Sequence, residues 1–74
     1  MPKEVKVPAE LEAAAEKVID LGMPAMRANY MFRYAVLKAA EKRENGNQSK
    51  AAVGLGMTRS AFNQAVALLE ARLS

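Results

Sequence analysis

The 74-residue chain contains no cysteine and no histidine. Disulfides, a thiol nucleophile and the usual zinc ligands are thereby excluded together. The sequence also has no glycine-rich loop of the kind that cradles phosphate. Tyr30 and Tyr34 remain as conceivable nucleophiles, but they belong to an apolar helix pattern without an arginine cluster. We therefore expect no enzyme, no metal site and no cofactor.

No apolar run approaches the roughly 20 residues that a membrane-spanning helix needs, and no signal peptide is recognisable. With the absence of cysteine, this favours the cytoplasm and gives no reason to expect a membrane partner. A chain of this length buries only about 60% of the surface of its unfolded state, so its core is marginal. We expect one domain over residues 1–74, stabilised by pairing with a second copy.

The net charge of +3 is unevenly distributed along the chain. Residues 9–22 carry four carboxylates against one lysine, a balance of −3, and residues 23–60 carry seven cations against two glutamates, a balance of +5. An acidic first helix before a basic remainder suits a protein that turns one face toward nucleic-acid phosphates. The alternative is that the cations only solvate the helices.

Apolar spacing and turn residues predict an all-α fold of four helices, with no strand, repeat or linker. The expected helices run from just after Pro8 to about Leu21, from Pro24 or Ala25 to Arg43, from Gln48 to Leu55, and from Arg59 to about Leu73. Gly22 is expected to end the first helix, and the Asn45-Gly46 pair is expected to end the second. Residues 1–7 are expected to form a flexible arm. Lys3 and Lys6 raise the alternative of an arm that reaches a minor groove.

The second expected helix is apolar on two sides. One side carries Met26, Tyr30, Tyr34 and Leu37, and the other carries Phe32, Ala35, Val36, Ala39 and Ala40. Two apolar sides require two buried faces. We expect one face to cover the last two helices and the other to meet a second subunit or the first helix. The apolar stripe of that first helix comprises Leu11, Ala14, Ala15, Val18 and Leu21.

Residues 47–69 have the pattern of a DNA-binding helix-turn-helix, two short helices joined by a tight turn. Asn47 and Thr58 are expected N-caps, and Gly56 suits a turn that needs positive φ. The residues expected to be buried between the crossing helices are Ala51, Ala52, Leu55, Met57, Phe62, Ala65 and Val66. Ala52 is expected to matter by its smallness, because a longer side chain would push the helices apart.

The segment from about Phe32 to Leu69 resembles the Fis-type helix-turn-helix. The matching residues are Gly46-Asn47-Gln48-Ser49-Lys50-Ala51-Ala52 and Leu55-Gly56-Met57-Thr58-Arg59. The second motif helix is more similar to the KorA-type plasmid repressors, through Leu55-Gly56, Thr58-Arg59, Ala61 and Gln64-Ala65-Val66. The resemblance implies a DNA-binding domain that works as a dimer.

Two features depart from the Fis-type pattern. Gly54 replaces a large apolar residue, which suggests either a close approach by another helix or a short helix. The last helix has Arg59 as its only early cation, where the Fis-type pattern is more basic. This second departure favours reading of bases over non-specific binding.

The exposed side of the last helix is expected to read base pairs. It carries Arg59, Ser60, Asn63, Gln64 and Ala67. Arginine suits guanine, asparagine and glutamine suit adenine, and alanine suits the thymine methyl group. The residues expected to contact phosphate lie at or near helix ends: Lys42, Arg43, Gln48, Ser49, Lys50 and Thr58. The alternative for Asn63 and Gln64 is that their side chains only solvate the helix and contact no base.

Two functional hypotheses follow. The first is a nucleoid-associated, homodimeric regulator of a plasmid, phage or bacterial operon, most simply a repressor, which binds an inverted repeat in double-stranded DNA. Repression is favoured because the sequence shows no separate effector domain, and a small DNA binder without one most simply acts by occupying a promoter. We expect no small-molecule ligand. The second is a small interaction module, an inhibitor or adaptor that reuses the same fold.

Overall fold

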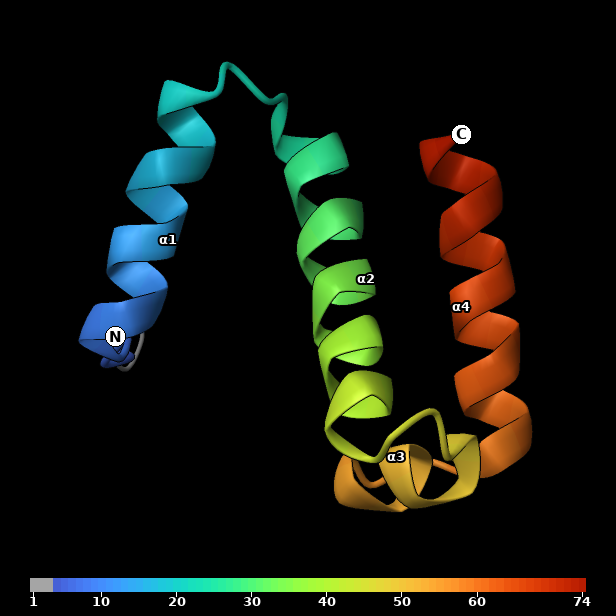
Figure 1. Cartoon of the computed structure of the whole chain (residues 1–74). Helices are drawn as coiled ribbons and strands as arrows, with labels where there is room; N and C mark the ends of the chain where they lie inside the picture. Colours follow the sequence, from blue (N-terminus) through green and yellow to red (C-terminus); the bar gives the residue numbers. More distant parts are fainter. Residues whose placement is uncertain (1–3) are drawn as a thin grey trace.

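The computed structural model describes residues 4–74, which form four helices and no strand. The helices are α1 (Ala9–Asp20), α2 (Ala25–Arg43), α3 (Gln48–Gly54) and α4 (Arg59–Leu73). Figure 1 shows α1 and α2 as an antiparallel hairpin, α4 running back beside α2, and α3 lying across the ends of α2 and α4. The predicted all-α, four-helix class is confirmed. Residues 1–3 of the predicted arm, with Lys3, lie outside the described residues, and residues 4–8 have no regular secondary structure.

The helix boundaries agree closely with the turn signals of the sequence. The limits of α2 and α4 are those predicted, whereas α1 and α3 each end one residue early, at Asp20 and Gly54. Gly56, at φ 71°, closes α3 in the left-handed conformation that glycine adopts without steric cost. There the amides of Gly56 and Met57 donate to the carbonyl oxygens of Val53 and Ala52, at 3.0 and 2.8 Å.

Both predicted N-caps are confirmed. The side chain of Asn47 accepts a hydrogen bond from the backbone amide of Lys50 at 3.0 Å, and Thr58 Oγ1 accepts one from the amide of Ala61 at 3.1 Å. Each bond satisfies an amide that has no partner in the first turn of its helix. The starts of α3 and α4 are therefore fixed by residues immediately before them.

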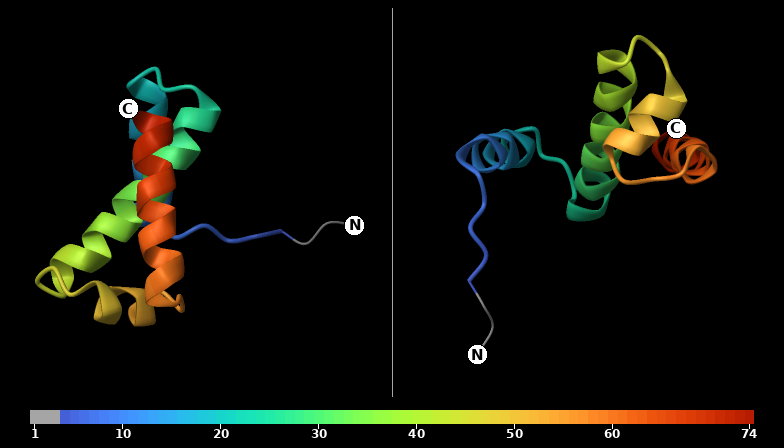
Figure 2. Two further views of the ribbon diagram at one scale, coloured as in Figure 1. Left: turned by 90° about the vertical axis from the view of Figure 1, so that its right-hand side faces the viewer. Right: turned by 90° about the horizontal axis from the view of Figure 1, so that it is seen from below.

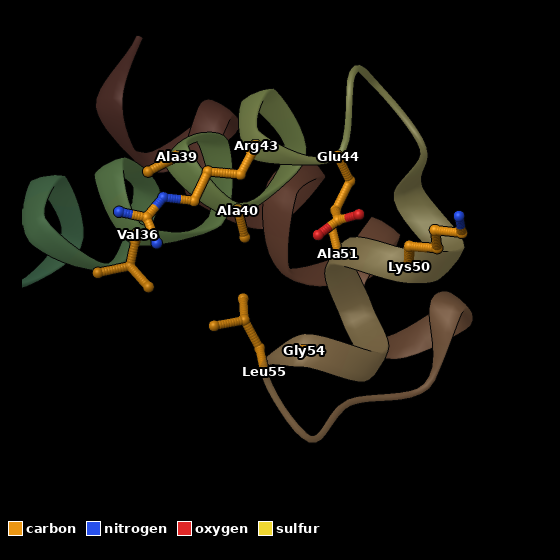
Figure 3. A pocket seen from close by; sticks show the side chains of 9 residues that line it. All are labelled: Val36, Ala39, Ala40, Arg43, Glu44, Lys50, Ala51, Gly54 and Leu55. Carbon is orange, nitrogen blue, oxygen red and sulfur yellow. The ribbon is translucent and has the colours of Figure 1, made fainter.

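The core lies between α2, α3 and α4. Its buried residues are Leu37, Ala51, Ala52, Phe62 and Leu69, and the half-buried residues packed on them are Tyr30, Tyr34, Ala40, Met57, Ala65 and Val66. Ala52 and Phe62 are fully buried, as the sequence predicts. The predicted burial of Leu55 is wrong, since its side chain is 37% exposed. Because α3 ends at Gly54, Leu55 is the C-cap and points into a groove opposite Val36 (Figure 3).

α2 separates the core from α1. Figures 1 and 2 show α1 and α4 on opposite sides of α2. The side of α2 with Tyr30, Tyr34 and Leu37 packs on the core, as predicted, whereas Met26 of that set is 63% exposed because it lies in the first turn of α2. On the other side, Phe32 is 47% exposed, and no residue of α1 is buried. Ala40, predicted for that second side, instead packs on the core.

Two hydrogen bonds between pairs of side chains join neighbouring helices. The Tyr34 hydroxyl donates to Glu70 Oε2 at 2.8 Å and links α2 to α4, which raises the pKa of Tyr34. Gln48 Nε2 donates to Glu41 Oε2 at 3.1 Å and links α3 to α2. Within residues 4–74, no helix is both long enough and apolar enough to cross a membrane.

Candidate nucleic-acid interface

The polar side of α4 faces solvent along its length. All five residues predicted to read bases are exposed: Arg59, Ser60, Asn63, Gln64 and Ala67. The buried residues Phe62 and Leu69 lie on the opposite side of the helix. The structure therefore brings the five side chains together on one continuous face, which the core does not use.

The direction of this face is set by the packing of α4 on α3. Phe62 is fully buried in the second turn of α4, so rotation of the helix about its axis would expose its ring. Thr58 caps the first turn, and Met57 is tied back to Ala52. These three constraints lie just before α4 or in its first residues, close in sequence to Arg59 and Asn63. The exposed face of α4 is thus held in a fixed orientation relative to α3.

Two of the candidate reading residues contact each other. Gln64 Nε2 donates to Ser60 Oγ at 3.5 Å, one helical turn apart. This bond is at the long end of the range for a hydrogen bond and is therefore weak. The amide of Gln64 is therefore only loosely held and remains available to another polar partner.

The candidate phosphate contacts come from three short segments. Lys42 and Arg43 lie in the last turn of α2, Ser49 and Lys50 in the first turn of α3, and Thr58 precedes α4; all five are exposed. Arg43 and Lys50 line one groove of about 380 Å³ between α2 and α3. Figure 3 shows Lys50 pointing away from this groove, toward solvent.

Gln48 differs from the other candidate phosphate contacts. It is half-buried, and its amide donates to Glu41, which also forms an ion pair with Lys38 at 3.0 Å. The hydrogen bonds from Lys38 and Gln48 lower the pKa of Glu41. The side chain of Gln48 therefore holds α3 against α2, and its contribution to an interface is indirect.

Two arginines that were not among the predicted residues lie beside Gln64. Arg33 of α2 and Arg72 of α4 line a groove together with Gln64. The guanidinium of Arg72 lies 5.9 Å from the centroid of the Tyr30 ring. The sequence contained a signal for Arg33, because it follows Tyr30 by three residues and precedes Leu37 by four, which places it near the α4 side of α2. Its proximity to Gln64 depends on the packing of α2 on α4.

Gly54 does not mark a close approach between helices. A Cβ atom built at Gly54 would meet nothing within 4 Å. That interpretation is wrong, and the alternative interpretation of a short helix agrees with the end of α3 at Gly54.

In comparisons with known proteins, no family model matches this chain, and neither a curated protein nor a solved structure matches it.

Proposed function

We propose that this protein is a sequence-specific, double-stranded DNA-binding regulator that acts as a homodimer. In this proposal α3 and α4 form a helix-turn-helix, and α4 is the recognition helix that enters the major groove. The observation that carries the proposal is the exposed face of Arg59, Asn63 and Gln64, presented by a helix whose opposite side is anchored by Phe62. These residue types match the bidentate edges of guanine and adenine.

The distribution of charge supports the same proposal. Lys42 and Arg43 are exposed at the end of α2, Lys50 near the start of α3, and Arg59 at the start of α4. Cations around a polar helix face position a protein on the phosphate backbone, while the face itself reads bases. Few cations lie on α4 itself, so binding would depend on base contacts more than in a strongly basic protein.

The local sequence adds support of a different kind. The resemblance of residues 46–59 to Fis-type proteins concerns the cap Asn47, the small residue Ala52 and the turn glycine Gly56, and each has the structural role that such a motif requires. The simplest mode of action for a small binder is repression, because a dimer on an operator blocks access of the polymerase. Association with the nucleoid would follow from DNA binding.

The direct test is selection of bound sequences from random double-stranded DNA with the purified chain. The proposal predicts an enriched inverted repeat, with binding that weakens steeply as salt is raised. An interaction module instead predicts no enrichment and a protein partner that binds through the exposed apolar surface. Recovery of no sequence motif at low salt, from protein shown to be folded by circular dichroism, would reject the DNA-binding proposal.

A further inference from the structure

α2 and α4 run side by side (Figure 1), and two grooves open between them on one flank of the pair. The first, of about 320 Å³, contains Leu68 and Arg72. The second, of about 270 Å³, contains Phe32. Arg33 and Ala65 line both grooves, so the two form one continuous depression, which we name the α2–α4 groove.

The apolar residues of the α2–α4 groove are open to solvent. Leu68 is 57% exposed and Phe32 is 47% exposed. The small side chain of Ala65 lies between the two parts of the groove and does not fill it. Large apolar side chains that are exposed together along a depression mark a site of contact with another molecule. This groove therefore suits a partner that supplies apolar side chains.

The charge along the groove is positive. Arg33 and Arg72 line it, and no carboxylate of residues 4–74 does. Within the same residues, neither guanidinium donates a hydrogen bond or forms an ion pair. Glu70 precedes Arg72 by two residues, but it lies on the opposite flank of α4, where it accepts a hydrogen bond from Tyr34. A complementary partner accordingly carries carboxylates.

The ring of Tyr30 holds Arg72 at the groove. The guanidinium lies 5.9 Å from the ring centroid, and Tyr30 is itself half-buried against the core. Stacking on an aromatic ring restricts the guanidinium but leaves its N–H groups available to a carboxylate. Arginine and tyrosine are also enriched among the residues that dominate the binding energy of protein interfaces.

A protein fits this groove better than DNA does. DNA phosphates would pair with the arginines but would gain nothing from Leu68 and Phe32. Gln64 is the one candidate reading residue that lines the groove, so most of the groove lies outside the face expected to contact DNA. A groove between two helices accepts a third helix, whose apolar residues at i, i+3, i+4 and i+7 enter it.

We propose that the α2–α4 groove binds an acidic amphipathic helix of a different protein, whose apolar side chains cover Leu68 and Phe32 and whose carboxylates pair with Arg33 and Arg72. The acidic α1 of another copy is a poorer occupant, because its apolar residues already line a groove against its own α2. This inference goes beyond the proposed function and does not depend on DNA binding.

The experiment is a selection from a displayed library of helical peptides of about 16 residues with randomised positions, using the full chain, shown to be folded by circular dichroism. Enriched peptides are expected to combine an apolar stripe with carboxylates. Fluorescence anisotropy then measures binding of the synthesised peptides. Leu68→Asp and Arg72→Glu should each weaken binding by about tenfold or more. Neither residue belongs to the buried core, so both variants should stay folded.

Charge reversal tests the pairing directly. Replacement of one carboxylate of the peptide by lysine, tried at each acidic position, should weaken binding to the wild type and at one position restore binding to Arg72→Glu. Leu21→Asp is the matched control, because Leu21 is 73% exposed and does not line the groove. This variant should bind the peptides as the wild type does.

Several results would overturn the inference: no enriched peptide, enriched peptides without an excess of carboxylates, or wild-type affinity of both Leu68→Asp and Arg72→Glu. Equally tight binding of a peptide with the sequence of residues 9–20 would assign the groove to a second copy instead. Loss of DNA binding by Arg72→Glu, with no peptide selected, would assign it to DNA. Arg59→Ala should impair DNA binding and leave peptide binding unchanged, so this inference and the proposed function fail independently.

Discussion

The backbone amide of Met57 donates a hydrogen bond to the carbonyl oxygen of Ala52 at 2.8 Å, across the turn that joins α3 to α4. The bond requires the left-handed conformation of Gly56, at φ 71°. It ties the residue before Thr58 to a fully buried position of α3. The direction in which α4 leaves the turn is therefore set by backbone geometry as well as by side-chain packing.

Substitution of the turn glycine should destabilise the protein. Gly56→Ala places a Cβ in the left-handed region, which costs about 1–2 kcal/mol. The free space around this position means that the loss comes from conformation alone, without a clash. Thermal unfolding followed by circular dichroism should show a lower melting temperature.

Gly54→Ala is the matched control for this experiment. Gly54 is helical, has no positive φ, and has open space where the methyl group would lie. Alanine should therefore stabilise the protein by about 0.5–1 kcal/mol. Equal effects of the two substitutions would show that the turn does not depend on a left-handed residue.

Overpacking at Ala52 should disturb the crossing of α3 with its neighbours. Ala52 is 0% exposed, so the larger side chain of Ala52→Leu has no space and should cost about 1–3 kcal/mol in unfolding free energy. DNA binding should fall with stability, because α3 supports α4. Val53 is the next residue and is 76% exposed, so Val53→Leu should change neither the unfolding free energy nor DNA binding. Unaltered chemical denaturation of Ala52→Leu would mean that the crossing is not tight at this point.

The contact between α2 and α3 should weaken in acid. Because hydrogen bonds from Lys38 and Gln48 lower the pKa of Glu41 below 4.5, its ionised form contributes stability above that pH. The contribution declines as the pH falls below 4.5 and is lost once the pH passes through the pKa of the folded state. Glu41→Gln should consequently lose less stability than the wild type between neutral pH and the acid range, as measured by urea unfolding.

Glu44→Gln provides the control for the acid experiment. The side chain of Glu44 makes no hydrogen bond within residues 4–74, so this variant should follow the wild-type pH profile. Superimposable profiles for wild type and Glu41→Gln would contradict the role given to Glu41.

The local features of the fold were predictable because they depend on residues close in sequence. The caps at Asn47 and Thr58 and the turn at Gly56 each involve hydrogen bonds within about one helical turn. Burial of Phe62 also follows from helical periodicity. The same periodicity placed the five candidate reading residues on one side of α4, and they are all exposed.

Other features depend on contacts between distant segments and could not be predicted. The amide of Gln48 is engaged by Glu41 across the turn after α2, so a residue expected to face phosphate instead joins two helices. Arg33 lies beside Gln64 only because α2 packs on α4. Leu55 is exposed because α3 ends one residue earlier than its apolar pattern suggests.

A homodimer with one recognition helix in each copy also predicts the spacing of the half-sites in the DNA that it binds. If two copies present one α4 each, the selected site should contain two half-sites about 34 Å apart, which is one turn of DNA. Insertion of half a helical turn of DNA between the half-sites should abolish cooperative binding in a gel-shift titration. Insertion of a full turn should reduce cooperative binding less. Indifference to both insertions would indicate that the half-sites are read independently.

In the proposed function, α4 reads bases while neighbouring cations hold phosphate. The most direct test is titration of Arg59→Ala, Gln64→Ala and Lys50→Ala against the selected site and a scrambled site, at low and high salt. Arg59→Ala and Gln64→Ala should each lose about 1–3 kcal/mol of discrimination at particular base pairs, with a smaller change on scrambled DNA. Lys50→Ala should weaken binding to both sites alike and reduce the salt slope by about one per subunit. Wild-type affinity of Arg59→Ala and Gln64→Ala for the selected site would contradict the assignment of α4 as the reading helix.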